Sequence, residues 1–380
     1  MAALWFLMIP GVTAASAGDR FIPADDSVVV ERLRERPLNR TDLELRSARA
    51  RLRAAPNDLP TALVVAERSM AIARRDGDPR YLGYAHAALA PWFAQADPPL
   101  TVRLLRATLL QSVHQFSPAL DELDEILRRQ PREPQAWLTR ASILQVLGRY
   151  ADAATSCERL KDLGAAFYAE ACLAELQSLT GNAAAGHARL AALRSGSRGG
   201  ADVGWLALVM AEMEERMGEF TSAEAHYREA LAGNADAYTK AAYADYLLDR
   251  GRPIEVIALL EREQRADPLL LRLALAYRAQ RRPELLAAVE ALQARFDAAR
   301  LRGDRVHLRE EARFELSLRD RPEIALALAV EDWSIQKEPA DARILLESAA
   351  AAHKPQQAAT VIKFLRESRL TDQRLARWLP

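Results

Sequence analysis

Apolar side chains recur along this chain at helical spacing, in segments that are separated by proline, Asp-Pro or glycine. Each segment has about 11 to 19 residues and repeats its apolar positions every three or four residues, which is typical of amphipathic helices. In the first and last parts of the chain this pattern alone predicts helices over Leu59–Arg75, Pro79–Ala94, Leu269–Arg282, Glu284–Arg302, Val306–Leu318, Glu323–Trp333, Ala340–Ala352 and Gln356–Arg366. The short connections indicate that these helices are joined in pairs.

The middle of the chain adds a regular repeat. Turn glycines follow one another at steps of 33, 37 and 33 residues, at Gly148, Gly181, Gly218 and Gly251. Small residues stand seven positions before them (Ala141, Ala174, Ala211 and Ala244) and, with one Val, five positions after them (Ala153, Gly186, Ala223 and Val256). Small side chains at both levels let two antiparallel helices approach closely. One step earlier, His114 takes the place of the glycine. This period predicts a stacked array of helical hairpins.

One unit of this array carries a family pattern, formed by Pro134, Trp137, Ala141, Gly148, Tyr150 and Ala153. These residues resemble the tetratricopeptide repeat (TPR) family. The resemblance extends from about residue 100 to 268, and other phrases of the chain are similar to uncharacterised secreted or periplasmic repeat proteins of GC-rich bacteria. The resemblance to the TPR family implies an all-α fold, an α-solenoid of antiparallel helix pairs in a right-handed superhelix. The concave face of such a superhelix is built mainly from the first helix of each pair and usually takes a peptide.

An array adds repeat units without starting a new core, so 380 residues can form one body with an open groove rather than an enclosed chamber. We expect a signal peptide, degenerate hairpins, TPR-like repeats, and degenerate repeats with a capping helix, over residues 1–17, 18–99, 100–268 and 269–380. The Gly- and Ser-rich segment 193–201 is expected to be a loop and a hinge. The cap is expected around Gln373–Leu379, with Trp378 packed inward and Arg374 and Arg377 outward.

The N-terminus has the pattern of a secretory signal peptide. The apolar stretch Ala2–Ala15 leads into a small-x-small pattern that predicts cleavage after Ala17. No lysine or arginine precedes Arg20, which leaves a native start upstream of Met1 as an alternative, besides a retained anchor and a cytosolic start. We favour export to a bacterial periplasm, with no transmembrane span in the mature chain.

Charge and cysteine content narrow the possible partners. The chain has 52 basic and 52 acidic residues, so it lacks the positive charge that nucleic-acid binding requires, and we expect no such partner. Its only cysteines, Cys157 and Cys172, fall on neighbouring helices of successive repeats. They could form a disulfide in an oxidising compartment, or each could be a small buried thiol. We favour the two thiols, because a bridge needs a particular geometry.

Motifs of catalysis and cofactor binding are missing from the sequence. It has no phosphate-binding loop, no His-Glu-x-x-His pair and no nucleophile elbow. His307 with Glu310 and Glu311 could bind a metal, but we favour an ordinary salt-bridged helix. We therefore predict no enzyme, no cofactor and no metal site.

Two columns of side chains are expected to face the groove. Six residues before the turn glycines stand Ser142, Glu175, Glu212 and Asp245, and thirteen before them stand Gln135, Tyr168, Trp205 and Tyr238. Acids beside aromatic rings suit a basic or amphipathic peptide. The plainer interpretation, to which we give more weight, is that the acids lie on a wet helix face and the rings pack between helices. Positions that clamp a terminal carboxylate in related repeats hold Leu104, Leu138, Ala171, Leu208 and Ala241, which disfavours a carboxylate tail as the ligand.

Three classes of function remain open. The first is a periplasmic scaffold or adaptor that binds a protein or peptide segment. The second is a permanent non-catalytic subunit or regulator of a cell-envelope complex, which would expose a contiguous apolar patch. The third, which we favour least, is an enzyme acting on envelope polymers. The sequence names neither the partner nor the oligomeric state.

Overall fold

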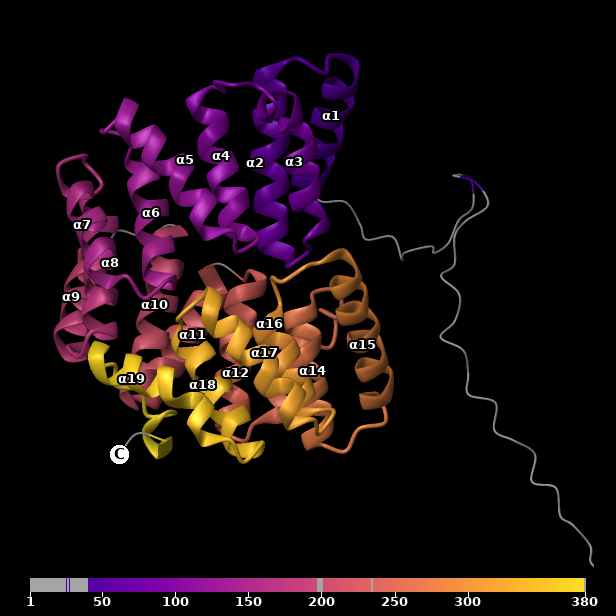
Figure 1. Ribbon diagram of the computed structural model, residues 1–380, viewed down its shortest axis with the longest axis vertical. Coiled ribbons are helices and arrows are strands. Elements are labelled where there is room, and N and C mark those ends of the chain that lie inside the picture. The colour runs from indigo at the N-terminus through magenta and orange to yellow at the C-terminus, as the bar shows by residue number, and fades with distance from the viewer. Residues whose placement is uncertain (1–24, 26, 28–39, 197–200, 234, 379–380) are drawn as a thin grey trace, which may run out of the picture. The chain divides into compact units, whose positions relative to one another are not determined.

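The computed structural model describes residues 25, 27, 40–196, 201–233 and 235–378 of the chain (Figure 1). The chain divides into two compact units, Met1–Leu43 and Glu44–Pro380. The expected signal peptide and its cleavage site lie outside the described residues, so those predictions remain untested. Residues 197–200 of the expected loop 193–201 also lie outside them, and the loop prediction is wrong at 193–195 and 201, which are helical. The account below concerns the second unit.

The described residues form α-helices and two short 3-10 helices, with no strand among them. The first half holds α1 (Arg40–Ala54), α2 (Leu59–Asp76), α3 (Arg80–Phe93), α4 (Leu100–Ser112), α5 (Phe116–Arg129), α6 (Pro134–Val146), α7 (Tyr150–Lys161), α8 (Ala166–Leu179), α9 (Ala183–Ser195) and α10 (Ala201–Met217). The second half holds α11 (Phe220–Gly233), α12 (Ala237–Asp249), α13 (Pro253–Leu260), α14 (Asp267–Ala279), α15 (Leu285–Arg302), α16 (Leu308–Ser317), α17 (Pro322–Ile335), α18 (Pro339–Ala351), η1 (Pro355–Ala358), α19 (Ala359–Ser368) and η2 (Ala376–Trp378). Within these ranges no helix combines the length and apolar character needed to cross a bilayer.

Successive helices pack as antiparallel pairs, from α2 with α3 to α16 with α17, which confirms the all-α solenoid of stacked helix pairs. The alanines seven positions before the turn glycines are fully buried, as are Ala153, Ala223 and Val256 behind the turns. At Gly186 an added Cβ atom would lie 2.4 Å from the carbonyl oxygen of Ala174. The close approach of paired helices therefore depends on the small residues that the sequence pattern identified.

The predicted turn positions are also confirmed. Gly148, Gly181, Gly218 and Gly251 all have positive φ angles, and His114 has a φ of 57° at the equivalent position. The later turns place Arg281, Asp320, His353 and Arg369 in the same left-handed region. Because those turns carry no glycine, the sequence repeat could not be followed beyond α13.

Cys157 and Cys172 form a disulfide between α7 and α8, so the favoured prediction of two free thiols is wrong. Their Cα atoms are 6.0 Å apart, within the range that a disulfide spans. The bridge joins the second helix of one hairpin to the first helix of the next, where close packing brings the two backbones together.

The expected C-terminal cap differs from the prediction. Only Ala376–Trp378 is helical, as a single 3-10 turn. Trp378 packs against the apolar core and Arg377 is exposed, as expected. Arg374 instead points inward, where it pairs with Asp372 at 2.7 Å and Glu215 at 3.5 Å. Those two carboxylates are buried, and a buried charge requires a partner of opposite sign.

Segments far apart in the sequence meet across the inner face of the array. Helix α2 packs against α12, and an added Cβ at Gly77 would lie 2.9 Å from the Cβ atom of Ala266. The α16–α19 region returns to the middle hairpins, where Arg343 pairs with Asp249 at 2.7 Å (Figure 1). The inner face is therefore covered from both ends of the chain.

Candidate functional site

The inner face lines a partly open cavity of about 630 Å³. Its walls come mainly from the first helices of seven successive hairpins, α6, α8, α10, α12, α14, α16 and α18. The predicted groove is therefore partly covered, because the C-terminal helices turn back over the middle ones. A cavity of this size is in the range of sites that hold small ligands or short peptide segments.

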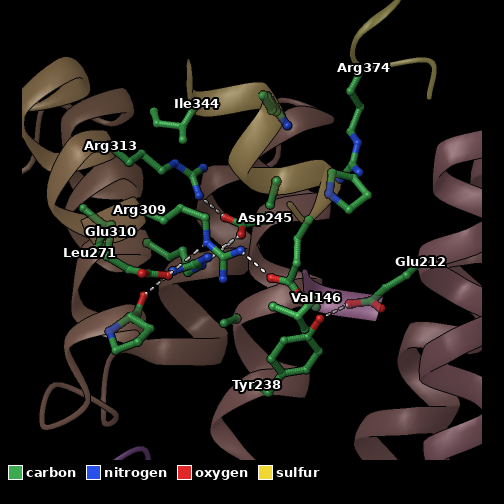
Figure 2. Close-up of a pocket in the computed structure, with 18 of the residues that line it drawn as sticks. Val146, Glu212, Tyr238, Asp245, Leu271, Arg309, Glu310, Arg313, Ile344 and Arg374 are labelled. Carbon is green, nitrogen blue, oxygen red and sulfur yellow. Dashed lines mark hydrogen bonds and ion pairs between the residues drawn. The ribbon is translucent and has the colours of Figure 1, made fainter. Parts of the chain in front are cut away.

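Three acids of the predicted column, Glu175, Glu212 and Asp245, line this cavity, and Ser142 is not among the lining residues. Asp245 is held between two arginines, with Oδ2 2.6 Å from Arg272 Nη2 and Oδ1 2.5 Å from Arg313 Nη1 (Figure 2). Burial opposes its ionisation, but the two guanidinium groups outweigh burial and keep the pKa of Asp245 below its ordinary value. Asp245 is therefore already neutralised within the protein.

Glu175 and Glu212 differ from Asp245 because neither forms an ion pair with a described lysine, arginine or histidine. Glu212 Oε1 accepts a hydrogen bond from the Tyr238 hydroxyl at 2.8 Å (Figure 2). Burial raises the pKa of Glu212 to about 7, although Tyr238 and Arg216 favour its charged form. Burial also raises the pKa of Glu175. The cavity thus holds two carboxyl groups whose negative charge is not compensated by a paired cation.

Arg216 is the cation that acts on both of these carboxylates. Within the described part of the chain it forms no ion pair with either carboxylate, and its Nη2 donates a hydrogen bond to Ser178 Oγ at 2.8 Å. Its attraction lowers the two pKa values without cancelling the effect of burial. A cationic ligand would therefore find both carboxylates available.

The opposite wall of the cavity carries arginines that are paired with acids. Arg309 Nη1 lies 2.8 Å from Glu338 Oε2 and 3.0 Å from Asp341 Oδ1. Burial opposes the ionisation of Glu310, but Arg309 and Arg272 outweigh it and lower the pKa of Glu310 to about 2. This wall is charged but internally neutralised, and sequence reasoning missed it because its cations come from the repeats without turn glycines.

The predicted aromatic column does not form one surface. Tyr238 lines the cavity and is 53% exposed, whereas the lining residues do not include Gln135, Tyr168 or Trp205. The Tyr168 hydroxyl donates to Asp202 at 2.9 Å, and the Tyr168 and Trp205 rings lie 6.1 Å apart between successive hairpins. Residues thirteen positions before a turn stand near the start of the first helix, where rings fill the gap between repeats.

The acids near His307 take part in ion pairs. Glu310 faces the cavity arginines, and Glu311 pairs with Arg300. No group of three or more histidine, cysteine, aspartate or glutamate side chains in the described part of the chain is placed to hold a metal ion. This arrangement matches the favoured interpretation of a salt-bridged helix.

No family model matches this chain, and no curated protein matches it either. Solved structures with a similar arrangement include the Cut9–Hcn1 hetero-tetramer of the APC/C (14% identity, TM-score 0.39), with 81% of this chain and 52% of that chain covered. A Rap protein complexed with competence and sporulation factor is similar at 12% identity and a TM-score of 0.47, with 89% of this chain and 99% of that chain covered. The P58(IPK) TPR domain is similar at 15% identity and a TM-score of 0.22, with 82% of this chain and 93% of that chain covered.

These likenesses are remote, and this chain spans about half the length, 52%, of the chain that it matches in the Cut9–Hcn1 complex. They assign no activity or ligand to it. The assignment as a solenoid of helix pairs rests on the helices, their pairing and their turns.

Proposed function

We propose that this protein is a non-catalytic, TPR-like adaptor that binds a short basic segment of a protein partner inside its cavity. The observation that carries this proposal is the pair Glu175 and Glu212, two enclosed carboxylates without a paired cation. An ionised carboxylate that has lost part of its hydration is unfavourable unless an opposite charge reaches it. A lysine or arginine side chain of a ligand would supply that charge.

The surroundings of the two carboxylates suit such a ligand. Charge-assisted hydrogen bonds between a carboxylate and an ammonium or guanidinium group are about twice as strong as neutral ones. The Tyr238 ring beside Glu212 offers an exposed aromatic face on which a cation or an alkyl stem can pack. Asp245 is not part of this binding group, because Arg272 and Arg313 already satisfy it.

The proposed location is the bacterial periplasm, after removal of residues 1–17. The disulfide between Cys157 and Cys172 supports this location, since disulfides persist in oxidising compartments and are rare in the cytosol. Mass spectrometry of the exported protein should find Gly18 as the first residue. A mature protein that still begins at Met1 would contradict the cleavage.

The binding proposal can be tested by selecting peptides from a random library on the wild-type protein and on the Glu175→Gln/Glu212→Gln variant. We expect lysine and arginine to be enriched only among peptides retained by the wild type. The control is Glu158→Gln/Glu255→Gln, which changes two exposed acids on the second helices α7 and α13. If the cavity variant retains the same basic peptides as the control, the proposed function is wrong.

A further inference from the structure

The C-terminal block, residues 308–378, meets the turns of the middle hairpins along a narrow line of contact, which we call the seam. Two backbone hydrogen bonds mark it. The Lys337 N–H donates to the Val146 carbonyl at 2.7 Å, and the Gln373 N–H donates to the Arg216 carbonyl at 2.9 Å. Val146 and Arg216 lie in the last turns of α6 and α10, where helix carbonyls lack an intrahelical donor. The block thus satisfies open helix ends of the middle hairpins.

The turn glycines form a second set of seam contacts. A Cβ atom at Gly148 would lie 2.7 Å from Phe364 Cε2, and one at Gly181 would lie 2.8 Å from Arg369 Cβ. Gly251 has a similar backbone conformation, with a φ of 68°, but no atom within 4 Å of its Cβ position. Glycine at the first two turns is therefore needed for close contact with the C-terminal block as well as for the turn itself.

Few apolar side chains cross the seam, and they include Ile335 of the block, which packs against the core of α4 to α6. The block has its own apolar core, built around residues such as Leu326, Trp333 and Val361. Among the residues described, the middle hairpins contribute to that core only the buried Leu179 and the partly buried Tyr150. When the contacts between two separate cores are small in area and polar, the two parts can move relative to each other. Large apolar interfaces do not permit this.

Ion pairs complete the seam, joining Arg343 to Asp249 and Arg374 to Glu215. At its other end the block stays attached to the array, because the Phe314 ring packs 5.3 Å from that of Phe296 in the core shared by α10 to α16. The block therefore shares a buried core with the array on one side, and on the other it is held by hydrogen bonds, charges and a few apolar side chains. This asymmetry is the arrangement of a hinged element.

We propose that the C-terminal block is a gate, which opens along the seam to admit a ligand to the cavity. One wall of the cavity belongs to the block, including Arg309, Arg313 and Arg343. Separation at the seam would move that wall away from Glu175 and Glu212 and widen the path into the partly covered cavity. This inference rests on the proposed function only in taking the cavity as the binding site. Elements that close over a ligand commonly set the rates at which the ligand enters and leaves.

Hydrogen exchange of the full chain, followed by mass spectrometry, tests the gate without any ligand. We expect the amides of Lys337 and Gln373 to exchange faster than those of the buried helix α14, which would report opening of the seam alone. Gly148→Ala should accelerate the exchange of these two amides at least tenfold. Gly251→Ala imposes the same backbone strain without the contact and should leave them unchanged.

The gate is overturned if these amides exchange as slowly as α14, or if Gly148→Ala and Gly251→Ala have equal effects. Asp249→Asn provides a milder perturbation in case the glycine variant does not fold. It removes the ion pair with Arg343, and at least threefold faster exchange at Lys337 is expected. No change there would also count against the gate.

A kinetic measurement with the peptide trilysine as the probe separates this inference from the proposed function. Opening the seam by Asp249→Asn should raise both the association and the dissociation rate, with a smaller change in their ratio. Unchanged rates would contradict the gate. If trilysine does not bind the wild type at all, the proposed function fails, while the exchange experiment still decides whether the seam opens.

Discussion

Replacing Glu212 by Gln should stabilise this protein at alkaline pH and leave its stability nearly unchanged in acid. The wild-type carboxyl is enclosed in the cavity without a paired cation, and burial raises its pKa from 4.5 to about 7. The folded state therefore binds the proton more tightly than the unfolded chain does. Glutamine is neutral at every pH, and its side-chain oxygen can still accept the hydrogen bond from Tyr238.

The direction of the pH dependence follows from that difference in proton affinity. Below about pH 4.5 Glu212 is protonated in both states, so it costs the folded state nothing. As pH rises toward 7 the unfolded chain ionises first, and stability is lost until the folded state ionises as well. A pKa difference of this size corresponds to at most about 3.4 kcal/mol, and water in the cavity should reduce the effect to about 1–2 kcal/mol.

Urea unfolding of the wild type and Glu212→Gln at pH 4.5, 6 and 8 measures this effect. We expect a difference of at most about 0.4 kcal/mol at pH 4.5, where the unfolded carboxyl is half ionised, and a gain of about 1–2 kcal/mol in the free energy of unfolding at pH 8. Glu158→Gln on the exposed face of α7 is the control and should stay within about 0.5 kcal/mol at each pH. A loss of stability at pH 8, or a gain that is the same at every pH, would refute the reasoning.

The remaining predictions concern stability. Asp245→Asn should lower the free energy of unfolding by about 2–4 kcal/mol in a urea titration, because it leaves the nearly buried Arg272 with only the longer 3.9 Å ion pair to Glu310; a change under about 0.5 kcal/mol would contradict the ion-pair assignment. Cys157→Ser/Cys172→Ser should cost about 3 kcal/mol for a sequence separation of 15, and reductant should destabilise only the wild type. Gly186→Ala should cost about 1–3 kcal/mol, since its Cβ would overlap a backbone carbonyl of α8, and an unchanged melting temperature would count against that contact.

The middle of the fold could be predicted from sequence because its signals are local. A glycine at a left-handed turn, such as Gly148, and small residues at fixed distances from it determine where each hairpin bends and how closely its helices pack. Helix boundaries elsewhere followed from apolar spacing, as for α2, which was expected over 59–75 and spans Leu59–Asp76. Both kinds of information are carried by residues near each other in the chain.

Closure of the cavity could not be predicted because it depends on residues far apart in the sequence. The later turns use Arg281, Asp320 and His353 in place of glycine, so the repeat register gave no sign that α16 and α18 would face α12. The cations were missed for the same reason. The equivalent positions of the recognisable repeats carry no cation, whereas Arg309 and Arg313 come from α16.

The acid column shows where sequence reasoning succeeded and where it failed. Its register correctly placed Glu175, Glu212 and Asp245 on one inner face. Whether a carboxylate is free depends on its neighbours, and the arginine pair at Asp245 includes one partner 68 residues away in the chain. The disulfide was similarly undecided, because a bridge requires a Cα separation that only the packed helices define.

The central claim is that Glu175 and Glu212 bind a cationic segment inside the cavity. Its most direct test is a calorimetric titration of the wild type with trilysine at low ionic strength, repeated with Glu175→Gln/Glu212→Gln and with Glu158→Gln/Glu255→Gln. We predict saturable binding that the cavity variant weakens at least tenfold, about 1.4 kcal/mol, and that the control variant leaves within twofold. Equal affinity for all three proteins, or no saturable binding to the wild type, would contradict the claim.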